Sequence, residues 1–172
     1  MNYFFIDAET DGLYGEFLSA AVLVTDESGK EIDRFYGANK IKPDDIKSKW
    51  VKENVLPHLK NAVATYETEY DLLEAVWFFW MKHRESALAV ADVMHPVESR
   101  LFTECVRHSL AEREMLAPFP LLDLSTLLNV HSEKSDIENR MAQEKALVRH
   151  DPMNDVIITA EIWFSLIEKF KY

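Results

Sequence analysis

The order of strand-like and helical segments constrains this chain more than any other feature of its sequence. Three strand-like segments, at residues 3–8, 17–25 and 31–37, follow one another through short polar connections, which predicts an antiparallel meander. Two further apolar segments, at 87–93 and 120–124, each follow helical sequence and are predicted as strands reached by helical crossovers. The order predicts an α/β fold with a mixed five-stranded sheet, three antiparallel strands and then two parallel ones, flanked by helices.

Apolar residues at helical spacing predict the helices that flank this sheet. The clearest helices are expected at 70–82 and 152–170, with another from His95 to about residue 114 and an irregular one near 50–59. The helix at 70–82 carries large aromatic side chains around most of its circumference. Such a helix packs into a core or forms an interface, so a homodimer is an open alternative.

The length and composition predict one domain spanning residues 1–172. The hydrophobic content of 48% is sufficient for a substantial core. The single cysteine, Cys105, rules out an intramolecular disulfide and suits a reducing compartment. No signal segment is recognisable, and the longest apolar runs are too short to cross a bilayer. We therefore expect a soluble, cytoplasmic protein with no membrane partner.

The formal net charge of −11 argues against a general duplex-binding role, which needs a basic face. It does not exclude a nucleic-acid enzyme, because carboxylates gathered for metal ions contribute to the deficit themselves. A charged stretch at 131–149 contains several basic residues, namely Lys134, Arg140, Lys145 and Arg149. This stretch is either a solvated face or the place where phosphate contacts are concentrated.

Acidic residues occur where the predicted elements end or begin. Asp7 and Glu9 close the first strand and, being two positions apart, are expected on one face. Glu98 and Asp155 fall in the first turns of two predicted helices, and His150 lies just before the second of them. Each acid alone is explained by the helix dipole or by chance. Together they form an ordered set that the neighbouring first and fourth strands would bring to one place.

The ordered set resembles the DEDD 3′–5′ exonucleases in their histidine form (DEDDh), an RNase H-like superfamily that includes RNase T. The stretch from Asp7 to Leu13 resembles the first motif, D-x-E-T-x-G-L, and the stretch from His150 to Asp155 resembles the third, H-x4-D. The second motif departs from the family pattern. Glu98 stands where the family has aspartate, with Asp92 as the competing candidate.

The resemblance implies a role for each of these residues. Asp7, Glu9, Glu98 and Asp155 would hold two Mg²⁺ or Mn²⁺ ions, because hard cations prefer oxygen ligands. The two ions would stabilise an in-line displacement at phosphorus, with His150 as the base that takes the proton of the attacking water. The substrate-binding residues implied by the resemblance hold the terminal nucleotide, and they are Thr10, Gly12 and Leu13.

The implied function is that of a metal-dependent 3′–5′ exonuclease that releases nucleotides from single-stranded RNA or DNA 3′ ends or from short oligonucleotides. RNA is slightly favoured over DNA, so the leading expectation is an exoribonuclease. One alternative is a catalytically silent RNase H-like domain that binds nucleic acid or a protein, which the departure at Glu98 favours. Another is a small-molecule phosphodiesterase or nucleotide hydrolase that uses the same ions.

Overall fold

The computed structural model describes residues 1–130 and 136–169, and its central feature is a six-stranded mixed sheet. The strand order is β4-β3-β2-β1-β5-β6, with β1, β2 and β3 antiparallel and the other pairs parallel. The strands are β1 Asn2–Thr10, β2 Phe17–Thr25, β3 Glu31–Asn39, β4 Ala64–Tyr66, β5 Ala87–Ala91 and β6 Leu121–Asp123. The predicted mixed sheet is confirmed, and β1 and β5 are neighbours.

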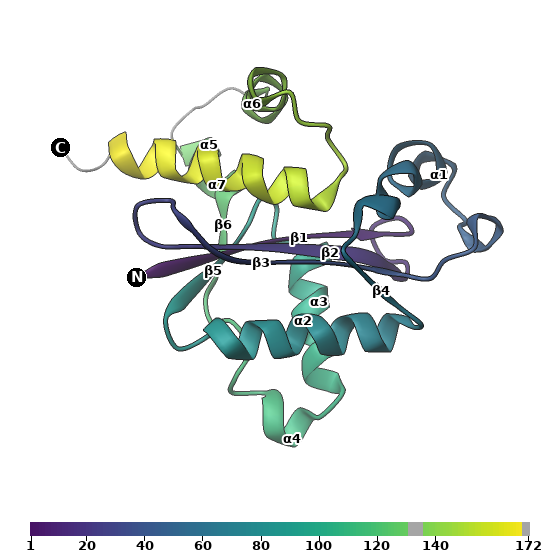
Figure 1. Cartoon of the computed structure of the whole chain (residues 1–172). Helices are drawn as coiled ribbons and strands as arrows, with labels where there is room; N and C mark the ends of the chain where they lie inside the picture. The colour runs from purple at the N-terminus through teal and green to yellow at the C-terminus, as the bar shows by residue number, and fades with distance from the viewer. Residues whose placement is uncertain (131–135, 170–172) are drawn as a thin grey trace.

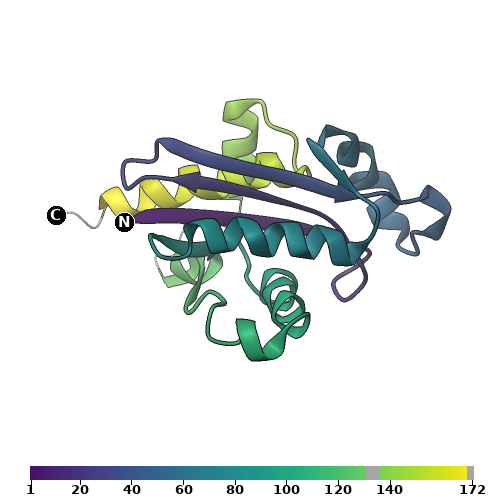
Figure 2. The ribbon, with the colours of Figure 1, turned by 60° about the horizontal axis from the view of Figure 1, so that its bottom comes forward.

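Helices cover both faces of this sheet. In Figure 1, α7 lies along one face, and α2 and α3 lie along the other. Figure 2, viewed from the α2 side, shows α1 at the end of the sheet opposite the N-terminus. The helices are α1 Lys49–Asn54, α2 Glu69–His83, α3 Val97–Arg107, α4 Leu110–Arg113, α5 Leu124–Val130, α6 Ile137–Lys145 and α7 Pro152–Lys169, with 3-10 turns at Pro43–Asp45 and Leu56–Asn61.

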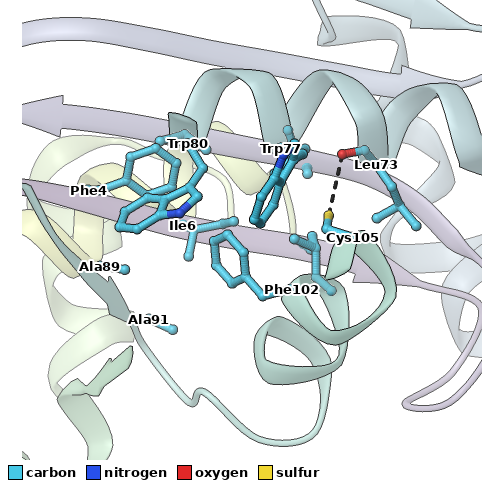
Figure 3. Packing of buried hydrophobic residues seen from close by; sticks show 14 of the residues in the cluster. Phe4, Ile6, Leu73, Trp77, Trp80, Ala89, Ala91, Phe102 and Cys105 are labelled. Atoms are coloured by element: carbon cyan, nitrogen blue, oxygen red, sulfur yellow. Dashed lines mark hydrogen bonds between the residues drawn. The ribbon is translucent and has the colours of Figure 1, made fainter. Parts of the chain in front are cut away.

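The central strands are buried on both faces and divide the core into two halves. All nine residues of β2 are buried. Along β1, Phe4 and Ile6 pack with α2 and α3, whereas Phe5 packs with α7. Figure 3 shows Trp77 and Trp80 of α2 in the first of these halves. Each large side chain buried in this way contributes about 1.5–3 kcal/mol, so the sheet is a rigid support for the residues at its end.

Some predicted elements differ from the structure. The sixth strand, β4, was not predicted, because it has only three residues and pairs with β3 at the edge of the sheet. The single helix predicted from His95 to about residue 114 is two helices, α3 and α4, separated at His108 and Ser109. The predicted helix end at residue 170 and the basic Lys134 lie outside the described residues.

Packing in the core accounts for most of the aromatic side chains of α2. Trp77 and Trp80 are buried, whereas Phe78 is 65% exposed. The prediction of a homodimer therefore stays a prediction.

Within residues 1–130 and 136–169, no helix is both long and apolar enough to span a bilayer.

An ion pair fastens α4 to α2. The Arg113 guanidinium donates to both oxygens of Glu74, at 2.7 and 2.8 Å, and it also donates to the carbonyl of Cys105 at 2.9 Å. It lies 5.0 Å from the centre of the Trp77 ring. The hydrogen bonds from Arg113 hold the pKa of Glu74 below its ordinary value.

We expect Arg113→Gln to lower the free energy of unfolding by about 2–3 kcal/mol at neutral pH, because Glu74 loses its bidentate partner. A depressed carboxyl pKa adds stability above the unfolded pKa, and that stability is lost as pH falls through the folded value. Thermal unfolding of both proteins between about pH 3 and pH 7 tests this. The difference should shrink toward the acid end, and a constant difference would contradict it.

Candidate active site

The site begins where β1 extends beyond its neighbour. β1 pairs with β5 only as far as Ile6 and Ala91, but it continues beside β2 to Thr10. Phe5 packs toward α7, so the alternation of a strand directs Asp7 and Glu9 to the same face. Both acids therefore lie beyond the end of β5, on the side covered by α7.

The first turn of α3 supplies the third acid. Glu98 is buried, with 5% of its surface exposed, and its Oε1 accepts a hydrogen bond from the backbone N–H of Ala8 at 3.2 Å. Because β5 has already ended, that N–H has no strand partner on this side. Glu98 therefore takes the place of a neighbouring strand and lies against β1.

The start of α7 supplies the fourth acid and the histidine. Asp151 caps the helix by accepting from the backbone N–H of Met153 at 3.1 Å, as the sequence pattern indicates. His150 has a left-handed backbone, with φ of +64°, and its N–H donates to Asp155 Oδ2 at 2.8 Å. Asp155 thereby holds the tight turn that carries the imidazole.

These residues line one cavity of about 200 Å³, which we call the acidic cavity. A carboxylate oxygen of Glu9, a ring nitrogen of His150 and a carboxylate oxygen of Asp155 all lie within 4.8 Å of one another. Two larger hollows, of about 740 and 550 Å³, share the loop around Phe119 and include none of these acids. The lining residues of the acidic cavity are Asp7, Ala8, Glu9, Leu13, Asp92, Val93, His95, Pro96, Val97, Glu98, Arg149, His150 and Asp155.

The carboxyl groups of the cavity resist ionisation. Burial, followed by repulsion from Glu9, raises the pKa of Asp7 well above its ordinary value. Burial also raises the pKa of Glu9 and of Glu98 to about 8, and it raises that of Asp155. Asp7 Oδ2 is buried without a hydrogen-bond partner among the described residues. Buried, mutually repelling oxygens of this kind fit divalent cations such as Mg²⁺ or Mn²⁺.

Asp92, the competing candidate in the second motif, also lines the cavity. It directly follows β5, and burial followed by the nearby Glu138 raises its pKa to about 7. Its Oδ1 is buried with no hydrogen bond from the described residues. The structure thus brings both Glu98 and Asp92 to the same lining, with Glu98 bonded to the Ala8 amide and Asp92 near Glu138.

The residues expected to hold the terminal nucleotide lie at the end of β1 and in the turn that follows it. The hydroxyl of Thr10 donates to the carbonyl of Gly12 at 2.7 Å, so it is engaged inside the turn. Gly12 has φ of +75°, a conformation that favours glycine. Leu13 is 61% exposed at the cavity. A contact between Leu13 and a base stays a prediction.

Two contacts at the site were not predicted from the sequence. Trp50 of α1 lies edge-on to the His150 ring, with 4.8 Å between ring centres. Asp11 positions that helix, because its carboxylate accepts from the backbone N–H groups of Lys47 and Ser48, both at 2.8 Å. A local sequence pattern contains no signal for contacts between residues so far apart in the chain.

Burial lowers the pKa of His150, which keeps the imidazole neutral near pH 7.

The comparisons with known proteins bear on the fold. No family model and no sequence of a curated protein matches this chain. The fold is similar to the zinc-bound form of E. coli ExoI in complex with single-stranded DNA, with a TM-score of 0.62 and 13% sequence identity. The match covers 99% of this chain and 41% of the ExoI chain. This chain therefore has the predicted RNase H-like α/β fold and spans about two-fifths of the length of that protein.

We expect Asp7→Asn to raise the free energy of unfolding of the metal-free protein by about 1–2 kcal/mol at alkaline pH, because it removes a repelled buried charge. A carboxyl group with a raised pKa loses stability as pH rises through its folded value, so the gain should fade toward acid pH, where Asp7 is protonated.

The measurement is thermal unfolding from acid to alkaline pH of the wild type, of Asp7→Asn and of the control Asp44→Asn, which changes an exposed acid. Added Mn²⁺ should stabilise the wild type and the control, and should stabilise Asp7→Asn much less. Destabilisation by Asp7→Asn at alkaline pH would indicate that the carboxylate is a structural group.

Proposed function

We propose that this protein is a metal-dependent 3′–5′ exonuclease that acts on single-stranded ends or short oligonucleotides, with RNA favoured over DNA. The observation that carries the proposal is the convergence of four acids and a neutral histidine on one small cavity. Asp7 and Glu9 come from β1, Glu98 from α3 and Asp155 from α7. The RNase H-like exonuclease fold of the chain supports the same activity.

The four carboxylates have the donor chemistry for two Mg²⁺ or Mn²⁺ ions. When bound, such ions supply stabilisation of the negative charge that develops around phosphorus during displacement. The chain holds the ligands on rigid elements, with Glu98 fixed by the Ala8 amide and Asp155 fixed by the His150 amide. We assign Glu98 as the second-motif ligand, because its carboxylate bonds the backbone of β1, and we assign Asp92, near Glu138, a supporting or substrate-facing role.

His150 is assigned as the general base. Burial favours its neutral form, so a ring nitrogen can accept the proton of an attacking water at neutral pH. The edge contact with Trp50 and the Asp155 hydrogen bond to its backbone restrict where the ring can go. A base held in this way is pre-positioned for a phosphodiester that enters the cavity.

The surroundings of the cavity favour a single-stranded end. Leu13 projects at its mouth, where an apolar side chain can pack against a terminal base. A formal net charge of −11 opposes binding of long duplex, whose affinity depends on many phosphate contacts. Short oligonucleotides make fewer such contacts and suit this chain better.

The experiment follows nucleotide release from single-stranded RNA and DNA of one sequence, each labelled at the 5′ end, with Mg²⁺ or Mn²⁺. We expect a ladder that shortens from the 3′ end and needs metal. His150→Ala should lower the rate about 10²–10⁴-fold, the usual worth of a general base. Asp7→Ala should abolish release, and Glu85→Gln, at an acid exposed on the surface, should release at the wild-type rate.

The other outcomes would each contradict the proposed exonuclease in a different way. No release from either polymer, together with metal-dependent stabilisation, would favour the silent domain. Hydrolysis of a small phosphodiester such as bis(p-nitrophenyl) phosphate without polymer shortening would favour the small-molecule enzyme. Equal release by wild type and Asp7→Ala would assign the activity to a contaminant and remove the proposal.

A further inference from the structure

Arg149 is a charged side chain of the acidic cavity that the proposed reaction leaves without a role. It directly precedes His150 on the loop that enters α7, and 25% of its side chain is exposed. Its Nε donates to Asp155 Oδ1 at 2.6 Å. Its Nη2 forms an ion pair with Glu138 Oε2 of α6 at 2.8 Å. The guanidinium therefore joins two acids that come from different helices.

The composition of the cavity lining makes this side chain distinctive. Among the described residues that line it, five are acids and Arg149 is the one lysine or arginine. A phosphodiester that enters brings further negative charge to this place. Arg149 is the residue here with a permanent positive charge, and its planar fork matches the oxygens of a phosphate.

The contact with Asp155 also bears on cations. Both Asp155 oxygens accept hydrogen bonds, Oδ2 from the His150 amide and Oδ1 from Arg149. A divalent cation that binds Asp155 must share or displace the Arg149 contact, and the two positive charges repel each other at such short range. The Glu138 pair can keep the guanidinium beside the cavity after that contact is lost.

We propose that Arg149 is a ligand for a substrate phosphate and that, before substrate arrives, it serves as the internal counter-ion of Asp155. The inference rests on the proposed nuclease activity and adds a coupling to it. Cation binding at Asp155 frees Arg149 for phosphate, and a phosphate that holds Arg149 frees Asp155 for cation. Metal and substrate therefore favour each other's binding through this one side chain.

The first test measures binding of Mn²⁺ alone by calorimetry, with no nucleic acid present. We expect Arg149→Gln to bind Mn²⁺ about tenfold more tightly than wild type, because Asp155 loses a charged competitor. Arg149→Lys keeps the charge without the fork, so it should fall between the two. Arg113→Gln is the matched control, since it removes a largely buried, acid-paired arginine that does not line the cavity, and it should leave Mn²⁺ affinity unchanged.

The second test measures binding of a single-stranded RNA oligonucleotide in Mn²⁺, with His150→Ala in every protein to prevent cleavage. Arg149→Gln should weaken binding about tenfold, in line with loss of one charge-assisted hydrogen bond. The slope of log K against log salt should become shallower by about 0.7, the value for one lost phosphate contact on a single strand. Arg113→Gln should leave both quantities unchanged.

The outcomes separate this inference from the proposed function. Equal or weaker Mn²⁺ binding by Arg149→Gln, with the wild type binding Mn²⁺, overturns the role of Arg149 as counter-ion and leaves the nuclease standing. An unchanged salt slope overturns the phosphate contact. Absence of Mn²⁺ binding in wild type and in every Arg149 variant overturns the metal-dependent function and the inference together. Thermal unfolding of each variant verifies that the compared proteins are folded.

Discussion

The site depends on the hydrogen bond between the Ala8 amide and Glu98. β1 extends past the end of β5, so its backbone presents a buried N–H group with no strand beside it. A buried donor left unpaired costs about 1–3 kcal/mol, and Glu98 removes that cost by accepting the hydrogen bond from the Ala8 amide. The same hydrogen bond brings the first turn of α3 to β1. One hydrogen bond therefore both pairs the free amide of β1 and fixes the position of Glu98.

The charges gathered there are tolerated because the rest of the structure is well supported. Burial and mutual repulsion raise the pKa values of the acids, which shows that their ionised forms are held unfavourably. The elements that carry them are fastened elsewhere, β1 between two buried half-cores and α7 along one sheet face. Stability supplied by those contacts allows strain at the cavity, the usual relation between a stable scaffold and a reactive site. Arg149 offsets part of the charge from within the chain.

Much of this arrangement could be predicted from the sequence because it follows from local rules. Strand alternation places Asp7 and Glu9 on one face, and the Asp151-Pro152 pair marks the start of α7. The element order predicts that β1 and β5 are neighbours. Such features depend on residues close in sequence or on well-established connection rules.

The remainder depends on tertiary contacts that leave no local pattern. β4 has three residues and exists because the edge of β3 accepts it, not because its sequence is strongly strand-forming. Trp50 contacts His150 from α1, and Asp11 accepts hydrogen bonds from the backbone that leads into α1, so these contacts join segments far apart in the chain. Arg149 belongs to a charged stretch whose composition does not distinguish a solvated face from a site. Its ion pairs with Glu138 and Asp155 show that Arg149 belongs to the site, and these two partners come from separate helices.

The departure at position 98 has a physical interpretation within this geometry. Both helix-borne acids use one oxygen to bind a backbone amide, Glu98 that of Ala8 and Asp155 that of His150. Asp155 binds an amide of its own turn, so a short side chain is sufficient. Glu98 has to cross from α3 to β1, and its additional methylene provides that reach. Its second oxygen is then left for the cavity that Glu98 lines. On this argument the glutamate that we propose as a metal ligand also satisfies the free amide of β1.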